Sequence, residues 1–222
     1  MNSTKVLLVV LSLSAMIILG CAVGNEPPEI VSVNIPSSIQ IDETVTLSVS
    51  AWDPDGDDLT YDWYVSEGTL TPSTGTVVQW TAPSTSGNVT ISVIVEDKHG
   101  ATDSEEETIY VSPITTTIID NNYTISAQDY YAVSKVLQAG YSVSGSFSVA
   151  SNDINFYVMD SENYNKWVNG QFAYAKVIIE RSTGATFGFD VSQTDTYYFV
   201  MDNTYSIFTS KSVYLKVTTT SP

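Results

Sequence analysis

The chain has 222 residues, with 25 acidic side chains against 8 lysines and arginines and a formal net charge of −17. This charge repels phosphate backbones and anionic lipid surfaces, and no basic patch offsets it, so we expect no nucleic-acid binding and no purely electrostatic membrane binding. One cysteine excludes an intramolecular disulfide and a cysteine-based zinc site. The many Val, Ile, Thr, Ser and Tyr residues predict an all-β protein.

The chain begins with a short apolar segment that ends at its only cysteine. Residues 6–19 carry no charge and follow Lys5, and they are fewer than the roughly 20 residues that a spanning helix needs. Gly20-Cys21 resembles the lipobox of bacterial and archaeal lipoproteins. The resemblance implies a signal helix in residues 1–20, lipid attachment at Cys21 and a lipid-anchored tether in residues 21–28. An uncleaved signal anchor and a plain secretory leader remain alternatives.

Residues 29–112 alternate apolar and polar side chains, as strands with one buried face do. The apolar positions are Val45, Leu47, Val49 and Ala51, then Leu59, Tyr61, Trp63 and Val65, then Ile91, Val93 and Val95, and finally Ile109 and Val111. Turn residues such as Asp53-Pro54-Asp55-Gly56 and Lys98-His99-Gly100 separate them. About seven short strands with turns at this spacing predict an antiparallel β-sandwich.

Within this region, residues 51–63 resemble the PKD-like and related Ig-like extracellular modules. They read Ala-Trp-Asp-Pro-Asp-Gly-Asp-Asp-Leu-Thr-Tyr-Asp-Trp, and Trp80-Thr81-Ala82-Pro83 and residues 93–97 continue the likeness. The Trp-Asp-Phe-Gly-Asp-Gly run of the core PKD subset is missing, because residues 63–68 read Trp-Tyr-Val-Ser-Glu-Gly. The resemblance implies an Ig-like spacer or binding module that performs no catalysis.

The acidic loop of this module raises the question of calcium. Asp53, Asp55 and Asp57 have the alternate spacing of hard oxygen ligands, but an EF-hand loop fails because Asp58 and Tyr64 stand where Gly and Glu are required. In an Ig-like sandwich the B–C and F–G loops share one end, which would bring Asp97 toward the three aspartates. We therefore consider a structural Ca²⁺ held by these four residues, with a solvated turn as the alternative and no other cofactor.

The same topology predicts where the chain enters the first module. The first strand of an Ig-like sandwich begins at the end that carries the B–C and F–G loops. Glu29 should therefore lie beside Asp55, and the acidic end would face the membrane, with the second module outermost. This module holds 15 acidic residues and one basic residue between residues 27 and 112.

Residues 113–222 resume the alternation and predict a second sandwich. The inward positions are Tyr141, Val143, Phe147, Val149, Ile154, Phe156, Val158, Val177, Ile179, Phe187, Phe189, Val191, Tyr197, Phe199, Met201, Val213, Leu215 and Val217. Residues 129–137 fit either one helical turn or an extended edge. Residues 141–147, 153–160 and 197–203 together resemble GOLD/emp24-like β-sandwiches, which implies a protein-interaction or accessory role.

We expect the segment from Asn163 to Phe172 to be a loop, and its composition is unusual. Tyr164, Trp167 and Phe172 stand beside asparagines and a glutamine. Aromatic rings supply contact area and amides supply hydrogen bonds, as in surfaces that bind sugars or proteins. The alternative is that Trp167 and Phe172 pack under the edge of the sandwich.

The sequence offers little material for catalysis. His99 is the only histidine and lies in a predicted turn, and no nucleophile elbow, His-Glu-x-x-His motif or phosphate-binding glycine loop is present. We therefore predict two tandem sandwiches, Ig/PKD-like and then GOLD-like, in a non-catalytic, lipid-anchored surface protein on the extracytoplasmic side. It would act as a spacer or bind an extracellular protein or glycan. The alternative is an accessory subunit that docks a secreted hydrolase or transport complex.

Overall fold

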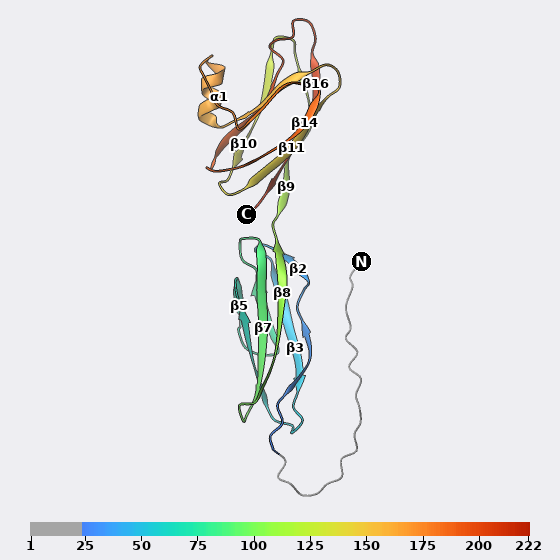
Figure 1. Ribbon diagram of the computed structural model, residues 1–222, viewed down its shortest axis with the longest axis vertical. Coiled ribbons are helices and arrows are strands. Elements are labelled where there is room, and N and C mark those ends of the chain that lie inside the picture. Colours follow the sequence, from blue (N-terminus) through green and yellow to red (C-terminus); the bar gives the residue numbers. More distant parts are fainter. Residues whose placement is uncertain (1–23) are drawn as a thin grey trace.

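The computed structural model describes residues 24–222, so the predicted signal helix and Cys21 lie outside the described residues. The described chain is built almost entirely of antiparallel strands, which confirms the all-β prediction. Two β-sandwiches lie end to end along the long axis of the molecule (Figure 1). From residue 24 to residue 222, no helix combines the length and the hydropathy needed to cross a bilayer.

The first sandwich consists of two four-stranded sheets, with strand orders β1-β3-β6-β5 and β2-β8-β7-β4. Its strands are β1 (Glu29–Asn34), β2 (Ser38–Gln40), β3 (Thr44–Trp52), β4 (Leu59–Val65), β5 (Thr69–Thr71), β6 (Val77–Thr81), β7 (Gly87–Asp97) and β8 (Thr102–Ser112). Neighbouring strands are antiparallel except β2 and β8, which run parallel. Apart from β2, the order is that of a constant-type Ig domain.

Two tryptophans form the centre of the first core. Trp63 of β4 is 2% exposed and Trp80 of β6 is fully buried. Each indole N–H donates to a backbone carbonyl, Trp63 to Gly75 at 3.0 Å and Trp80 to Glu67 at 3.1 Å. Burying these rings therefore leaves no unpaired donor, and the core is stable without a disulfide.

The second sandwich also pairs two four-stranded sheets, with orders β10-β15-β12-β13 and β14-β11-β16-β9. Its strands are β9 (Thr115–Ile125), β10 (Tyr130–Leu137), β11 (Ser142–Val149), β12 (Ile154–Met159), β13 (Val177–Ser182), β14 (Gly184–Asp190), β15 (Asp195–Asp202) and β16 (Lys211–Thr220). Successive strands alternate between the sheets except at the β12–β13 hairpin, and the first and last strands pair. This connectivity is a jelly roll.

Two segments of the second sandwich had an open or a wrong assignment from the sequence. Residues 130–137 form the edge strand β10, so the extended alternative is correct. The aromatic segment expected to be a loop contains the helix α1 (Ser161–Val168). The helix lies against β12 and β15, on the outer face of their sheet.

Residues at the end of the chain lie in the junction between the sandwiches (Figure 1). Ser221 donates its N–H to the carbonyl of Ile114 at 3.0 Å, and its hydroxyl accepts the Ile114 N–H at 2.9 Å. The carbonyl of Pro222 accepts the N–H of Ser86, in the first sandwich, at 3.2 Å. These bonds fasten the linker and connect the second sandwich to the first.

Asn203 fastens the opposite end of the second sandwich. Its side chain is fully buried, and its Nδ2 lies 2.9 Å from the carbonyl oxygens of Ser126 and Thr209 and 3.4 Å from that of Ile125. One amide therefore joins the β9–β10 and β15–β16 connections.

We expect Asn203→Asp to lower the free energy of unfolding by about 3 kcal/mol, because a carboxylate would face these carbonyls with no hydrogen to donate. Urea denaturation measures this change, and Asn165→Asp on the exposed face of α1 is the matched control. Equal stability of the two variants would show that the Asn203 amide does not hold these loops.

Candidate functional site

The helix α1 forms where the local sequence supplies its caps. The carboxylate of Asp160 accepts the N–H of Asn163 at 2.9 Å and so caps the N-terminus. Glu162 lies in the first turn and Lys166 in the last, which suits the helix dipole, and the two side chains form an ion pair. Local interactions therefore stabilise both ends of the helix.

Tyr164 and Trp167 point from α1 toward the sheet, since residues three apart share one helix face. The ring of Tyr164 stacks on Tyr198 of β15 with centroids 3.8 Å apart, and Trp167 meets Tyr130 of β10 edge-on at 4.9 Å. Burial, together with the hydrogen bond to Tyr130, raises the pKa of Tyr164 to about 12. Tyr164 and Trp167 are therefore half-buried packing groups between α1 and the sheet, and a role of either in ligand binding stays a prediction.

Phe172 stands apart from this cluster. It is 77% exposed, and Tyr174, two residues on, is 71% exposed. The two rings meet edge-on with centroids 4.9 Å apart. Phe172 therefore does not pack under the sandwich, and its partner is a residue that the sequence reasoning missed. The signal available was the spacing, because the alternate positions 172 and 174 project together from an extended segment.

Hydrogen bonds hold this aromatic pair in place. The side-chain carbonyl of Asn163 accepts the N–H of Tyr174 at 2.9 Å, while its amide nitrogen donates to Asp160. The N–H of Gln171 donates to the carbonyl of Lys166 at 2.9 Å. The segment that carries Phe172 and Tyr174 is thus tied to the helix on both sides of Phe172.

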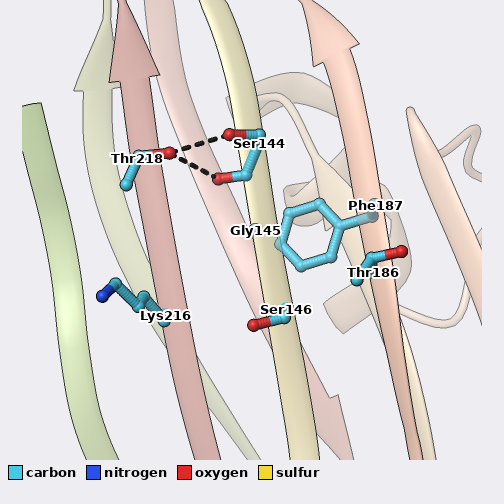
Figure 2. Close-up of a pocket in the computed structure, with 7 residues that line it drawn as sticks. All are labelled: Ser144, Gly145, Ser146, Thr186, Phe187, Lys216 and Thr218. Atoms are coloured by element: carbon cyan, nitrogen blue, oxygen red, sulfur yellow. Dashed lines mark hydrogen bonds between the residues drawn. The ribbon is translucent and has the colours of Figure 1, made fainter. Parts of the chain in front are cut away.

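A hollow lies on the other sheet of the second sandwich (Figure 2), with a volume of about 330 Å³. Its lining is Ser144, Gly145, Ser146, Thr186, Phe187, Lys216 and Thr218. The hydroxyls of Ser144 and Thr218 are 2.8 Å apart and bond to each other. The hollow thus presents hydroxyls and one ammonium group, and its lining contains no carboxylate or imidazole to move a proton. No motif in the sequence points to these residues.

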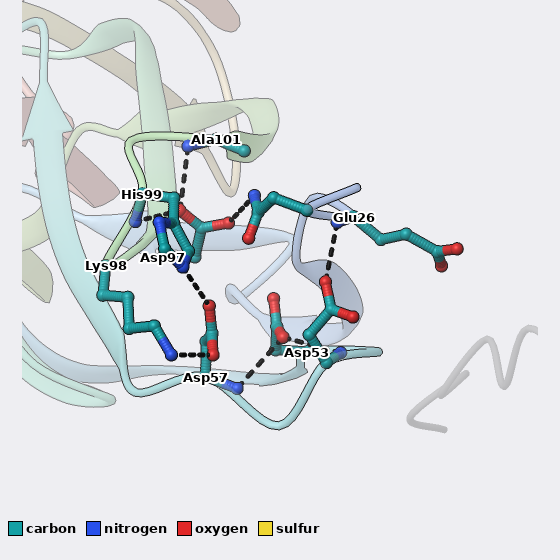
Figure 3. Close-up of polar contacts among 9 residues, drawn as sticks. Glu26, Asp53, Asp57, Asp97, Lys98, His99 and Ala101 are labelled. Carbon is teal, nitrogen blue, oxygen red and sulfur yellow. Dashed lines mark hydrogen bonds and ion pairs between the residues drawn. The ribbon is translucent and has the colours of Figure 1, made fainter. Parts of the chain in front are cut away.

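At the acidic end of the first sandwich, aspartate side chains accept backbone N–H groups of their own turns (Figure 3). Asp53 accepts the N–H groups of Asp55 at 2.9 Å and Asp57 at 3.0 Å through Oδ1. Asp97 accepts the N–H groups of His99 at 2.8 Å and Ala101 at 2.9 Å. Each carboxylate therefore closes its own loop.

The F–G loop, which joins β7 to β8, supplies the positive charge at this end. The ammonium group of Lys98 forms an ion pair with Asp57, and the imidazole Nε2 of His99 lies 3.5 Å from the same carboxylate. The bond to Asp57 raises the pKa of Lys98.

The segment before β1 binds the same end. The amide of Asn25 donates to Asp97 Oδ2 at 2.7 Å, and the N–H of Glu26 donates to Asp55 at 2.8 Å. Glu29 pairs with Trp52, directly before Asp53. The chain therefore enters beside the aspartates, which confirms that Glu29 and Asp55 share one end.

The Asn25 amide also lowers the pKa of Asp97, and the loop N–H groups add to this effect. A carboxylate whose pKa is lower in the folded state stabilises the fold above its unfolded-state pKa. This stabilisation is lost as the pH falls through the lower, folded-state value.

The predicted four-residue calcium site depends on which aspartate oxygens these contacts leave available. Oδ2 of Asp53 and Oδ2 of Asp57 are buried without a hydrogen-bond partner. Across residues 24–222, however, no three His, Cys, Asp or Glu side chains are grouped so that they could hold a metal ion. Two free oxygens are fewer than the six to eight that Ca²⁺ takes. The calcium hypothesis remains a prediction for experiment.

Residues 25–112 match the family model described as Bacterial Ig domain. The first sandwich thus has an Ig-like fold and resembles bacterial Ig domains, while the narrower PKD-like and GOLD-like assignments stay predictions. No curated protein matches the chain.

Solved structures resemble the chain only distantly. A nucleoside hydrolase-related hypothetical protein from Saccharophagus degradans, described as associated with carbohydrate metabolism, is 23% identical, with a TM-score of 0.35 over 39% of this chain and 26% of that one. A carbohydrate-binding module of the β-sandwich superfamily is 12% identical, with a TM-score of 0.32 over 86% and 97%. The Bacteroides ovatus protein SGBP-B, in complex with a mixed-linkage heptasaccharide, is 9% identical, with a TM-score of 0.30 over 82% and 49%.

The chain thus spans about a quarter of the first of these proteins and half of the third.

We expect millimolar Ca²⁺ to leave the melting temperature of the protein unchanged, because Lys98 already neutralises Asp57 and backbone N–H groups fill Asp53 Oδ1. Differential scanning fluorimetry with Ca²⁺ or with a chelator measures this. A rise in melting temperature that disappears in Asp53→Asn would instead support the calcium site.

Proposed function

We propose that the chain is a non-catalytic, lipid-anchored protein of the extracytoplasmic surface that binds a glycan through Phe172 and Tyr174. The observation that carries this proposal is the exposed aromatic pair, 77% and 71% accessible, on a segment tied to α1 by hydrogen bonds. Exposed rings fixed before binding lose little conformational entropy when a ligand orders them.

The groups around the pair suit a neutral, hydroxyl-rich ligand. Asn165 on α1, and Asn169 and Gln171 between α1 and the pair, are exposed. Their amides can donate to and accept from sugar hydroxyls, while the aromatic faces cover the apolar face of a sugar ring. Lys166 and Glu162 neutralise each other, so the surface does not select for ligand charge.

A binding role also agrees with the chemistry available elsewhere. His99 is exposed and faces Asp57 in a turn of the first sandwich. The hollow in the second sandwich contains hydroxyls and Lys216 but no acid–base pair. These features support a non-catalytic protein.

The anchor would position this surface away from the membrane. Residues 21–28 span at most about 28 Å when extended, and Asn25 and Glu26 are bound at the acidic end. The first sandwich then separates the second sandwich from the bilayer. This arrangement depends on lipidation of Cys21.

We expect Phe172→Ala and Tyr174→Ala to weaken retention of the chain on a polysaccharide at least about tenfold, the loss that follows from removing an aromatic anchor. A polysaccharide array followed by affinity electrophoresis measures this. Phe208→Ala is the matched control, since Phe208 is 93% exposed on another loop. Trp167→Ala is a poor test because it would unseat α1.

The alternative function has a distinct outcome in the same material. If no polysaccharide is retained, and a pull-down that depends on Phe172 recovers one secreted hydrolase or transport protein, the chain is an accessory subunit.

We expect mass spectrometry of the mature N-terminus to find Cys21 as the first residue with a diacylglyceryl group attached. Cys21→Ser should abolish this mass and keep the leader uncleaved. An intact Met1 or an unmodified Cys21 would contradict the lipid anchor but would leave the glycan-binding test unaffected.

A further inference from the structure

The strand β14 is an edge strand whose outer backbone groups are free to pair. It pairs with β11 on one side only. The N–H of Val149 donates to the Thr183 carbonyl, and the N–H of Val191 donates to the Tyr141 carbonyl. Hydrogen-bonded residues alternate along an antiparallel pair, so the odd-numbered residues of β14 are the ones that bond to β11. The N–H and C=O groups of Thr186 and Gly188 therefore point away from β11, toward the open side of the strand. Within residues 24–222, no side chain or loop hydrogen-bonds to them.

The other edge strands have features that discourage pairing. The edges β1, β4, β9, β10 and β13 carry Glu29, Asp62, Asp120, Lys135 and the pair Glu180 and Arg181. The edges β2 and β5 are three residues long. By contrast, β14 reads Gly-Ala-Thr-Phe-Gly-Phe before its final residue, Asp190. Natural proteins protect sheet edges with charges, short strands or bulges, and β14 has no such protection before Asp190.

The side chains of β14 also suit an added strand. Ala185, Phe187 and Phe189 are half-buried at the margin of the core, where Phe187 packs on Phe156 with ring centroids 4.9 Å apart. Thr186 and Gly188 on the outer face are small. A further strand would cover the margin of the core without meeting a bulky or charged group.

We propose that β14 pairs with β14 of a second copy of this chain in antiparallel orientation. An antiparallel edge is complementary to itself, because each copy offers the donors and acceptors that the other needs. The net charge of −17 makes most faces of two copies repel. The uncharged edge lies on the sandwich with the smaller charge, where 9 acidic residues face 6 basic ones after residue 112. Two copies meet there with the least repulsion.

Crosslinking of the full chain in phosphatidylcholine vesicles tests this pairing. Thr186→Cys treated with a short bismaleimide is expected to give at least about ten times more covalent dimer than Thr124→Cys. Thr124 is an exposed threonine on β9, the opposite edge of the same sheet. The unsubstituted chain measures the background from Cys21. Equal dimer from the two variants would overturn the proposal.

A lysine pair gives a second readout. Thr186→Lys places a charge on the edge and is expected to abolish self-association, measured by light scattering of the vesicles, whereas Thr124→Lys leaves it unchanged. Equal behaviour of the two variants contradicts the pairing. Both substitutions are at exposed positions, so melting temperatures should match the parent; if Thr186→Lys lowers the melting temperature, the crosslinking comparison decides. Phe172→Ala should not affect either readout, which separates this inference from the glycan-binding proposal.

Discussion

The structure depends on side chains packed between paired sheets, because a single cysteine cannot provide an intramolecular crosslink. Each sandwich has its own core, around Trp63 and Trp80 in the first and Phe156 and Phe199 in the second. The loops at the sheet ends lie outside these two apolar cores. They are held by polar side chains that accept or donate to the backbone, namely Asp53, Asp97 and Asn203, each less than a tenth exposed. Hydrogen bonds thus hold the loops in place at the ends, and apolar packing holds the sheets together inside.

The acidic end shows how a charged region can remain ordered. The first sandwich carries most of the negative charge of the chain, yet the carboxylates of Asp53 and Asp97 point at backbone N–H groups. Lys98, the only basic residue between residues 27 and 112, lies where it neutralises Asp57. Asn25 then joins the incoming chain to the F–G loop through Asp97. The same aspartates therefore carry the negative charge of this end and bind the segment that enters the sandwich.

Sequence patterns predicted the strands well, because alternation reports directly which face is buried. The helix α1 could not be predicted with equal ease. Its eight residues include two asparagines and no buried residue, so intrinsic propensity is weak, and packing of Tyr164 and Trp167 on the sheet stabilises it. Without the helix, composition alone could not show that Trp167 packs on the sheet while Phe172 is exposed. The jelly-roll order was also inaccessible, since β9 pairs with β16 across most of the module.

The direction of β14 has a consequence for how two copies would be placed. The last residue of β14, Asp190, pairs with Ser142, which also pairs with Thr220 next to the junction, so the strand starts at the far end of the second sandwich and runs toward the junction. A second copy joined to it in antiparallel orientation has its own first sandwich at the opposite end. If Cys21 of each copy carries a lipid, as proposed, the two anchors of such a pair would face away from each other, and a single bilayer could not hold both copies upright. With that anchor in place, the pairing would join two facing membranes, and the two first sandwiches together with the paired second sandwiches would set the distance between them.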